Sequence, residues 1–112
     1  MVVATGIVEI YVHESRSLKE KRAVLRRMTH RIQNTFNVSV AEVGGGDHWK
    51  RSIIGFSMVG NERAFINSKV DKLISFIEKM NLADIVNTHV EIVAISHEMA
   101  GSAGSEETYD EF

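Results

Sequence analysis

The order of hydrophobic and polar residues divides the chain into four strand-like and two helix-like segments. In residues 2–13, Val8, Ile10 and Val12 fall on one side while polar or aromatic residues fall on the other. This period-2 alternation is typical of a half-buried strand. Three further strands are expected from alternation or from β-branched content, over residues 38–43, 49–60 and 85–95.

The first helix is predicted to begin at Ser17, because Ser17 and Glu20 have the spacing of a capping box. At 100° per residue the apolar residues then form one stripe, made of Leu18, Val24, Leu25, Met28 and Ile32. Lys21 also falls on this buried side, and we expect it to reach solvent at the helix edge. The helix ends within residues 34–37. A second helix is predicted over residues 62–80, with Asn61 as its N-cap.

These segments occur in the order β-α-β-β-α-β, with Gly44-Gly45-Gly46-Asp47 as the turn between the second and third strands. This order is the ferredoxin-like split βαβ pattern. The sequence therefore predicts an α+β fold, in which a four-stranded antiparallel sheet carries two helices on one face. Alternation assigns to the open face of the sheet Ile7, Glu9, Tyr11, His13, His89, Glu91, Val93 and Ile95.

Length and composition favour a small globular protein. The 112 residues allow one domain, and 44% hydrophobic with 25% charged residues is ordinary for a soluble chain. The absence of cysteine excludes disulfides, thiol catalysis and cysteine–zinc sites. No apolar run reaches the roughly 20 residues that span a bilayer, and the N-terminus does not have the pattern of a signal peptide. We therefore expect a cytoplasmic protein.

Charge is distributed unevenly. Residues 15–31 hold seven Lys or Arg against the single acid Glu20, a local net charge of +6 in a chain whose net charge is −2. Residues 98–112 hold five acids and no Lys or Arg. We expect a single ferredoxin-like domain over residues 1–97 and an acidic, disordered C-terminal tail over residues 98–112.

Two motifs resemble a known bacterial family. SLKEKR at residues 17–22 and NVSVAEVG at residues 37–44, followed by Asp47, Trp49 and Arg51, are similar to the YlxP-like proteins, which carry a domain of unknown function. The likeness covers most of the chain and implies a ferredoxin-like fold. Family members are typically encoded among genes for translation initiation and ribosome maturation, so the resemblance implies ribosomal RNA or a ribosomal subunit as a partner. It implies no catalytic residue and no cofactor.

The basic first helix is the main candidate for nucleic-acid binding. Exposed cations at helical spacing meet phosphates through salt-sensitive contacts, and here they are Lys19, Arg22, Arg26, Arg27 and His30. The alternative is a solvated helix face that pairs with local acids. Glu20 is the one acid on the helix, which weakens that alternative.

The glycine turn is the second candidate. Its glycines allow backbone N–H groups to approach an anion, Trp49 can stack on a base, and Lys50 and Arg51 add positive charge. The alternative is a hairpin loop whose tryptophan packs against the sheet edge. Base stacking on the open sheet face is not expected, because the third strand lacks the basic and aromatic consensus of an RNA-recognition motif and Glu9 and Glu91 would repel phosphates.

Other readings stay open beside an RNA- or ribosome-associated accessory factor. Apolar residues on the open sheet face suggest a homodimer, and hence a homo-oligomeric regulatory or small-ligand-binding domain. His13, His89 and Glu91 would form a metal site if the first and last strands bring them together. No catalytic motif is present, so we do not expect an enzyme.

Overall fold

The structure, a computed structural model, describes residues 1–96 and contains six elements. The expected disordered tail at 98–112 lies outside the described residues. In chain order the elements are β1 (Val2–Tyr11), α1 (Leu18–Thr35), β2 (Ser39–Gly44), β3 (Arg51–Gly60), α2 (Arg63–Lys79) and β4 (Asp84–Ala94). The predicted order of elements is confirmed.

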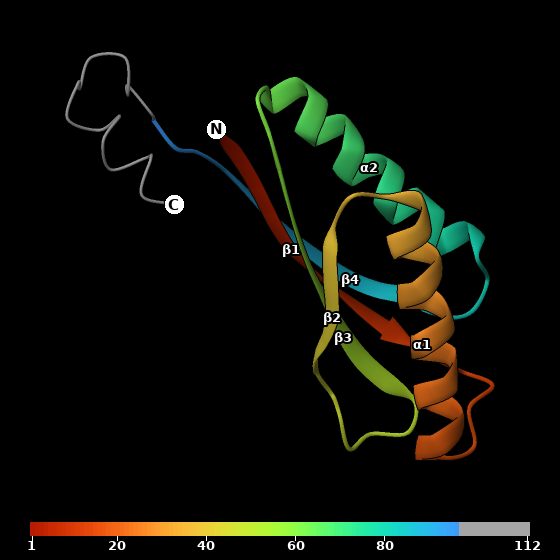
Figure 1. Cartoon of the computed structure of the whole chain (residues 1–112). Coiled ribbons are helices and arrows are strands. Elements are labelled where there is room, and N and C mark those ends of the chain that lie inside the picture. The colour runs from red at the N-terminus through yellow and green to blue at the C-terminus, as the bar shows by residue number, and fades with distance from the viewer. Residues whose placement is uncertain (97–112) are drawn as a thin grey trace, which may run out of the picture.

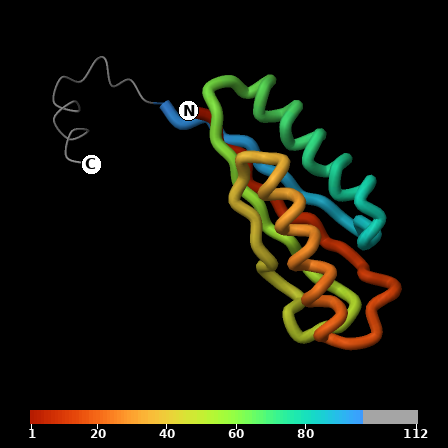
Figure 2. Tube along the Cα trace, turned by 45° about the vertical axis from the view of Figure 1, so that its right-hand side comes forward, coloured from red at the N-terminus to blue at the C-terminus, as the bar shows by residue number. Residues whose placement is uncertain are grey.

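The four strands form one antiparallel sheet in the order β2-β3-β1-β4, and both helices cover the same face (Figure 1). The rotated view in Figure 2 shows the helices as one layer and the sheet as a second. The N-terminus lies beside the end of β4, where the Ile95 N–H donates to the Met1 carbonyl at 2.7 Å. The ferredoxin-like α+β fold is therefore confirmed, with β1 and β3 in the centre and β2 and β4 at the edges.

The core lies between the sheet and the two helices. Alternation holds on both central strands, where Val8, Ile10 and Val12 of the first segment and Ile54, Phe56 and Met58 of β3 are all buried. The helices bury one stripe each, and the buried stripe of α2 consists of Ile66, Val70, Leu73 and Ile77. Near the C-terminal end of α1, Phe36 and Phe76 meet edge to face with ring centroids 5.4 Å apart, which joins the two helices.

Some predicted boundaries are wrong. The N-cap of α2 is Glu62 and not Asn61, and no side chain caps this helix. Its first turn is held instead by the Ile66 N–H, which donates to the Glu62 carbonyl at 3.1 Å. β3 begins at Arg51 and not at residue 49, because residues 45–50 are drawn into a hydrogen-bonded loop that leaves them outside the ladder.

Gly6 sits on the helix-facing side of β1, and the ring of Phe56 fills the space that a side chain would take. A Cβ built on Gly6 would lie 2.6 Å from Phe56 Cζ and 3.1 Å from the His89 carbonyl oxygen. The two residues are direct partners in the β1–β3 register. Phe56, the largest side chain of the sheet core, therefore fits in this position because its partner on β1 is glycine.

We predict that Gly6→Ala lowers the free energy of unfolding by about 1 to 3 kcal/mol, because the added methyl overpacks a buried aromatic contact. Gly46→Ala is the matched control, since no atom lies within 4 Å of a Cβ at that position. Urea denaturation of both variants measures the difference. Equal stability of the two variants would contradict the close contact.

Candidate nucleic-acid interface

The first helix begins where its sequence predicts. The Glu20 N–H donates to Ser17 Oγ at 3.1 Å, and the Arg16 N–H donates to Glu20 Oε1 at 2.6 Å. These two bonds form the predicted capping box. They also engage the single carboxylate of α1 with the backbone, so that Glu20 holds the helix start in place while the helix continues to Thr35.

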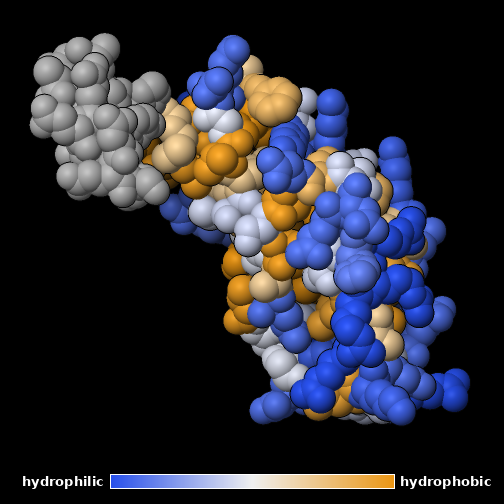
Figure 3. Space-filling model, in the orientation of Figure 1, coloured by the Kyte–Doolittle hydropathy of each residue, from blue (hydrophilic) through white to orange (hydrophobic). Residues whose placement is uncertain are grey.

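The helix presents its cations to solvent and its apolar stripe to the sheet. Leu25, Met28 and Ile32 are buried. On the opposite side, six residues are all exposed: Lys19, Arg22, Arg26, Arg27, His30 and Arg31. Figure 3 shows the resulting hydrophilic band over α1. These cations form a row from Lys19 to Arg31, which are twelve residues apart, so the row is about 18 Å long at a rise of 1.5 Å per residue.

These exposed cations have no acidic partner within residues 1–96. The ion pairs of that part of the chain are His13–Asp84, Lys21–Glu42, Arg51–Glu9 and His89–Glu91. None of them involves an exposed cation of α1. Among residues 1–96, the alternative in which local acids neutralise this face is therefore not realised, and the charges stay in contact with solvent.

The other basic residue of the helix, Lys21, was predicted to reach solvent, and this prediction is wrong. Its side chain is 0% exposed. The ammonium donates to three carbonyl oxygens of the hairpin loop, those of Gly45 at 2.7 Å, Gly46 at 3.3 Å and Arg51 at 3.2 Å. The carbonyls satisfy the donors of the ammonium, which is why the charge can lie inside the protein.

A carboxylate completes this arrangement. Glu42 Oε2 lies 3.4 Å from Lys21 Nζ and accepts a hydrogen bond of 2.6 Å from the buried hydroxyl of Ser52. Lys21 comes from α1, Glu42 from β2 and Ser52 from β3. We call these three residues with their loop carbonyls the Lys21 cluster. It joins the helix, both strands of the hairpin and the loop at one place.

The hairpin loop has a defined conformation. Gly45 has φ of 74°, and a Cβ there would lie 2.9 Å from the Arg51 carbonyl oxygen, so this position needs glycine. The His48 N–H donates to the Gly45 carbonyl at 3.0 Å. His48 Nδ1 in turn accepts from the N–H groups of Lys50 and Arg51, at 3.1 Å each. The backbone donors that an anion would need are thus partly used within the loop.

The loop residues that were predicted to bind nucleic acid, Trp49, Lys50 and Arg51, contact other groups of the protein. Lys50 Nζ donates to the His13 carbonyl at 2.8 Å and lies 5.7 Å and 5.5 Å from the ring centroids of Tyr11 and Trp49. Arg51 Nη1 is 3.8 Å from Glu9 Oε2. Trp49 is 46% exposed and its ring is covered on one side by the Lys50 ammonium. Stacking of Trp49 on a base therefore competes with a cation–π contact.

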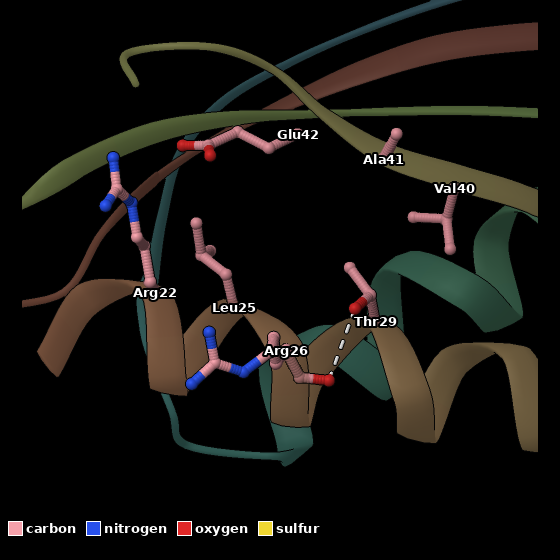
Figure 4. Close-up of a pocket in the computed structure, with 7 residues that line it drawn as sticks. All are labelled: Arg22, Leu25, Arg26, Thr29, Val40, Ala41 and Glu42. Carbon is pink, nitrogen blue, oxygen red and sulfur yellow. Dashed lines mark hydrogen bonds between the residues drawn. The ribbon is translucent and has the colours of Figure 1, made fainter. Parts of the chain in front are cut away.

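The two groups of candidate residues lie on different surfaces. Arg51 pairs with Tyr11 in the β1–β3 register, on the open face of the sheet, whereas α1 covers the opposite face. The helix row instead continues into a shallow groove beside the edge strand β2 (Figure 4). The side chains that line it are Arg22, Leu25, Arg26 and Thr29 from α1, with Val40, Ala41 and Glu42 from β2.

The residues of the metal hypothesis do not meet. His89 pairs with Ile7 on β1, whereas Asp84 pairs with Tyr11, and His13 follows two residues later. His13 and His89 are thus separated by six residues along β1, or about 20 Å. His13 binds Asp84 at 3.2 Å and His89 binds Glu91 at 3.1 Å. No group of three metal-ligating side chains occurs in residues 1–96.

The fold and this surface define a ferredoxin-like domain with a strongly basic first helix. The family of proteins of unknown function DUF503 matches residues 3–90, and the chain belongs to this family. The uncharacterized protein YlxP of Bacillus subtilis (strain 168) is 40% identical over 70 residues, which are 62% of this chain and 76% of that protein. The resemblance to YlxP-like proteins is therefore confirmed.

Solved structures with similar folds include a de novo designed protein with the ferredoxin fold. Its TM-score is 0.49 at 12% identity, over 87% of this chain and 90% of that one. A dimeric ferredoxin-like protein from an uncultured marine organism has a TM-score of 0.46 at 9% identity, over 87% of this chain and 100% of that one. Within residues 1–96, no helix is both long and apolar enough to cross a membrane.

We predict that Lys21→Met lowers the free energy of unfolding by roughly 2 to 3 kcal/mol, because loop carbonyls and the Glu42 carboxylate lose a charged donor. Lys19→Met is the control, since it removes an exposed charge two positions earlier and is expected to change stability by less than about 0.5 kcal/mol. Urea denaturation measures both. Glu42→Gln and the double variant Lys21→Met, Glu42→Gln complete a double-mutant cycle. If the double variant lost as much stability as the two single variants together, Lys21 and Glu42 would have no interaction energy, which would contradict this contact.

Proposed function

We propose that this domain binds the phosphate backbone of structured RNA, or of a ribosomal particle, through the exposed face of α1. It acts as an accessory factor in ribosome maturation or translation and not as a catalyst. The observation that carries the proposal is the row of exposed cations on α1, none of which has an acidic partner within residues 1–96.

The geometry of the helix supports backbone contacts more than base readout. Arg22, Arg26 and His30 recur at intervals of four residues, so their side chains stand slightly more than one helical turn, or about 6 Å, apart along the axis. Arginine guanidinium groups match phosphate oxygens through paired N–H donors. Such contacts position a protein on RNA without reading sequence. The expected binding is therefore tight at low salt, weak at high salt and tolerant of sequence.

The ribosomal part of the proposal rests on the family. The chain belongs to the YlxP-like family. The resemblance to this family implies a place among genes for translation initiation and ribosome maturation. A basic α1 gives such a protein a means of meeting ribosomal RNA. On the same ground we propose a cytoplasmic location.

A homo-oligomeric regulatory or small-ligand-binding domain is the second candidate function. It is favoured by the large apolar residues exposed on the open face of the sheet, among them Ile7, Val59 and Val93. A tight dimer without affinity for RNA would support this alternative. The two functions use opposite sides of the domain. Substitutions on one side can therefore be tested without changing the surface on the other.

We predict that the domain cosediments with ribosomal subunits and with naked ribosomal RNA at low salt and is released at high salt. If it neutralises four phosphates, log K should fall with log salt with a slope of about −3 to −4. The variant Lys19→Glu, Arg22→Glu, Arg26→Glu should bind on the order of 100-fold more weakly at 0.1 M salt, with a shallower slope.

The matched control carries the same change of charge on the other helix, at the exposed residues Arg63, Lys72 and Lys79, each changed to Glu. We expect it to keep most of the affinity, because the row on α1 is intact. Failure of wild type to bind at low salt would contradict the proposal, and so would an equal loss in both triple variants, which would reveal a response to net charge alone.

The acidic residues that follow the domain supply a further test. Residues 98–112 carry five acids and no Lys or Arg, and we expect them to compete with RNA for α1. Deleting residues 98–112 should therefore raise the affinity for RNA. A full-length variant in which the five acids become Gln or Asn should show the same increase. Unchanged affinity in both proteins would refute the competition.

A further inference from the structure

The open face of the sheet carries most of the large apolar residues that remain exposed. Nine such side chains are at least 41% exposed within residues 1–96. Six of them belong to this face: Met1, Ile7, Val43, Val59, Val93 and Ile95. The helices contribute Phe65 alone. A random scatter of apolar residues would distribute them over both faces, so this concentration marks a surface suited to a partner.

The apolar residues form a continuous patch at one end of the face. Val59, Val3 and Val93 are direct neighbours across β3, β1 and β4 in the strand register. Met1 and Ile95 extend the patch by one residue pair, because the Met1 ammonium donates to the Ile95 carbonyl at 3.0 Å and the Ile95 N–H donates back to the Met1 carbonyl. We call these five residues the valine patch.

Beyond this patch the face mixes apolar and polar residues, because Glu91 is the partner of Thr5 and His89 the partner of Ile7 in the β1–β4 register. Ile7 pairs with Gly55, and Gly55 has no side chain to stand between Ile7 and β2. Val43 fills part of that space, since a Cβ built on Gly55 would lie 2.9 Å from Val43 Cγ1. The far end of the face is polar, where Arg51 and Asp84 flank Tyr11.

We propose that the open face of the sheet binds a second copy of this chain, with a two-fold axis that runs along β1. An axis in this direction sets like ends against like ends, so the valine patch of one copy meets the valine patch of the other. β3 of each copy then faces β4 of the second copy. The arrangement is isologous and therefore closes at two subunits.

The polar end of the face fits the same axis. Arg51 and Asp84 lie on either side of Tyr11 in one cross-strand row. Rotation about β1 brings Arg51 of each copy opposite Asp84 of the second copy, which pairs opposite charges twice. An axis across the strands would instead place the valine patch against this charged end. At this end of the face, charge complementarity favours the axis along β1. Glu9 then faces Glu9 of the second copy across the axis, and each of these carboxylates keeps Arg51 of its own copy, 3.8 Å away, as its partner.

The size of the face is close to what a stable dimer needs. Four strands at about 4.8 Å spacing and ten residues at about 3.3 Å rise cover a projection of about 600 Å². Because side chains protrude from this plane, the accessible area of the face exceeds its projection. It thus approaches the about 800 Å² that each partner buries in an interface of standard size. A second copy covers the whole face at once, which a small ligand cannot do.

The test is sedimentation velocity of the full-length chain over about 1 to 200 μM, at 0.1 M and at 1 M NaCl. We expect a dimer that persists at 1 M NaCl, since apolar burial is not screened by salt. The variant Val59→Lys, Val93→Lys should raise the dissociation constant at least 100-fold. The nearly isosteric variant Val59→Thr, Val93→Thr keeps residues that favour strands and should raise it at least tenfold, which covers the case in which the lysine variant does not fold.

The control is Phe65→Lys, which changes a 60% exposed apolar residue on α2 and should leave the dimer unchanged. A wild-type monomer at 200 μM would overturn the proposal. A dimer that both valine variants leave intact would do the same, because it would use another surface. RNA binding by α1 is measured separately and falls with salt, so failure of either proposal is recognised independently of the other.

Discussion

A single buried ammonium joins the parts of this domain that are far apart in sequence. Lys21 Nζ contacts carbonyl oxygens at residues 45, 46 and 51, and a carboxylate at residue 42. A buried charge without such acceptors would cost several kcal/mol, so the helix and the hairpin loop are stable only when they form together. Together with the buried stripe of Leu25, Met28 and Ile32, this contact fixes the rotation of the helix about its own axis, and so the direction in which the exposed cations of α1 point.

The sheet separates two surfaces of different chemistry. The helix layer presents arginine and lysine side chains to solvent, and the open face presents aliphatic side chains. On the open face, the opposite charges of Arg51 and Glu9 pair with each other, which reduces the net charge of this surface. A domain of this size therefore presents a basic surface and a partly apolar surface on opposite sides.

The sequence alone was sufficient for the order of elements and for the buried and exposed sides of α1, because each depends on local periodicity and on the Ser17–Glu20 capping box. It was not sufficient for contacts between distant residues. The helical wheel placed Lys21 on the buried side, but its acceptors lie 24 to 30 residues away. The order of the strands predicts that His13 and His89 are neighbours, but the β1–β4 register, which depends on distant pairing, separates them along the strands. The second N-cap was predicted one residue early, at Asn61, because asparagine is favoured at helix starts. The helix has no side-chain cap, so this preference carries no information there.

The edges of the sheet decide what kind of assembly is open to the domain. β2 is only six residues long, and a bulge at residues 42–44 interrupts its ladder beside Arg22 and Arg26. β4 is longer, but a bulge beside Glu9 and Ile10 of β1 breaks its register, and it carries His89 and Glu91 on its outward face. Short, kinked and charged edges resist the addition of further strands. Growth of the sheet from molecule to molecule, which leads to fibres, is therefore disfavoured by the length, the bulges and the charges of its edge strands.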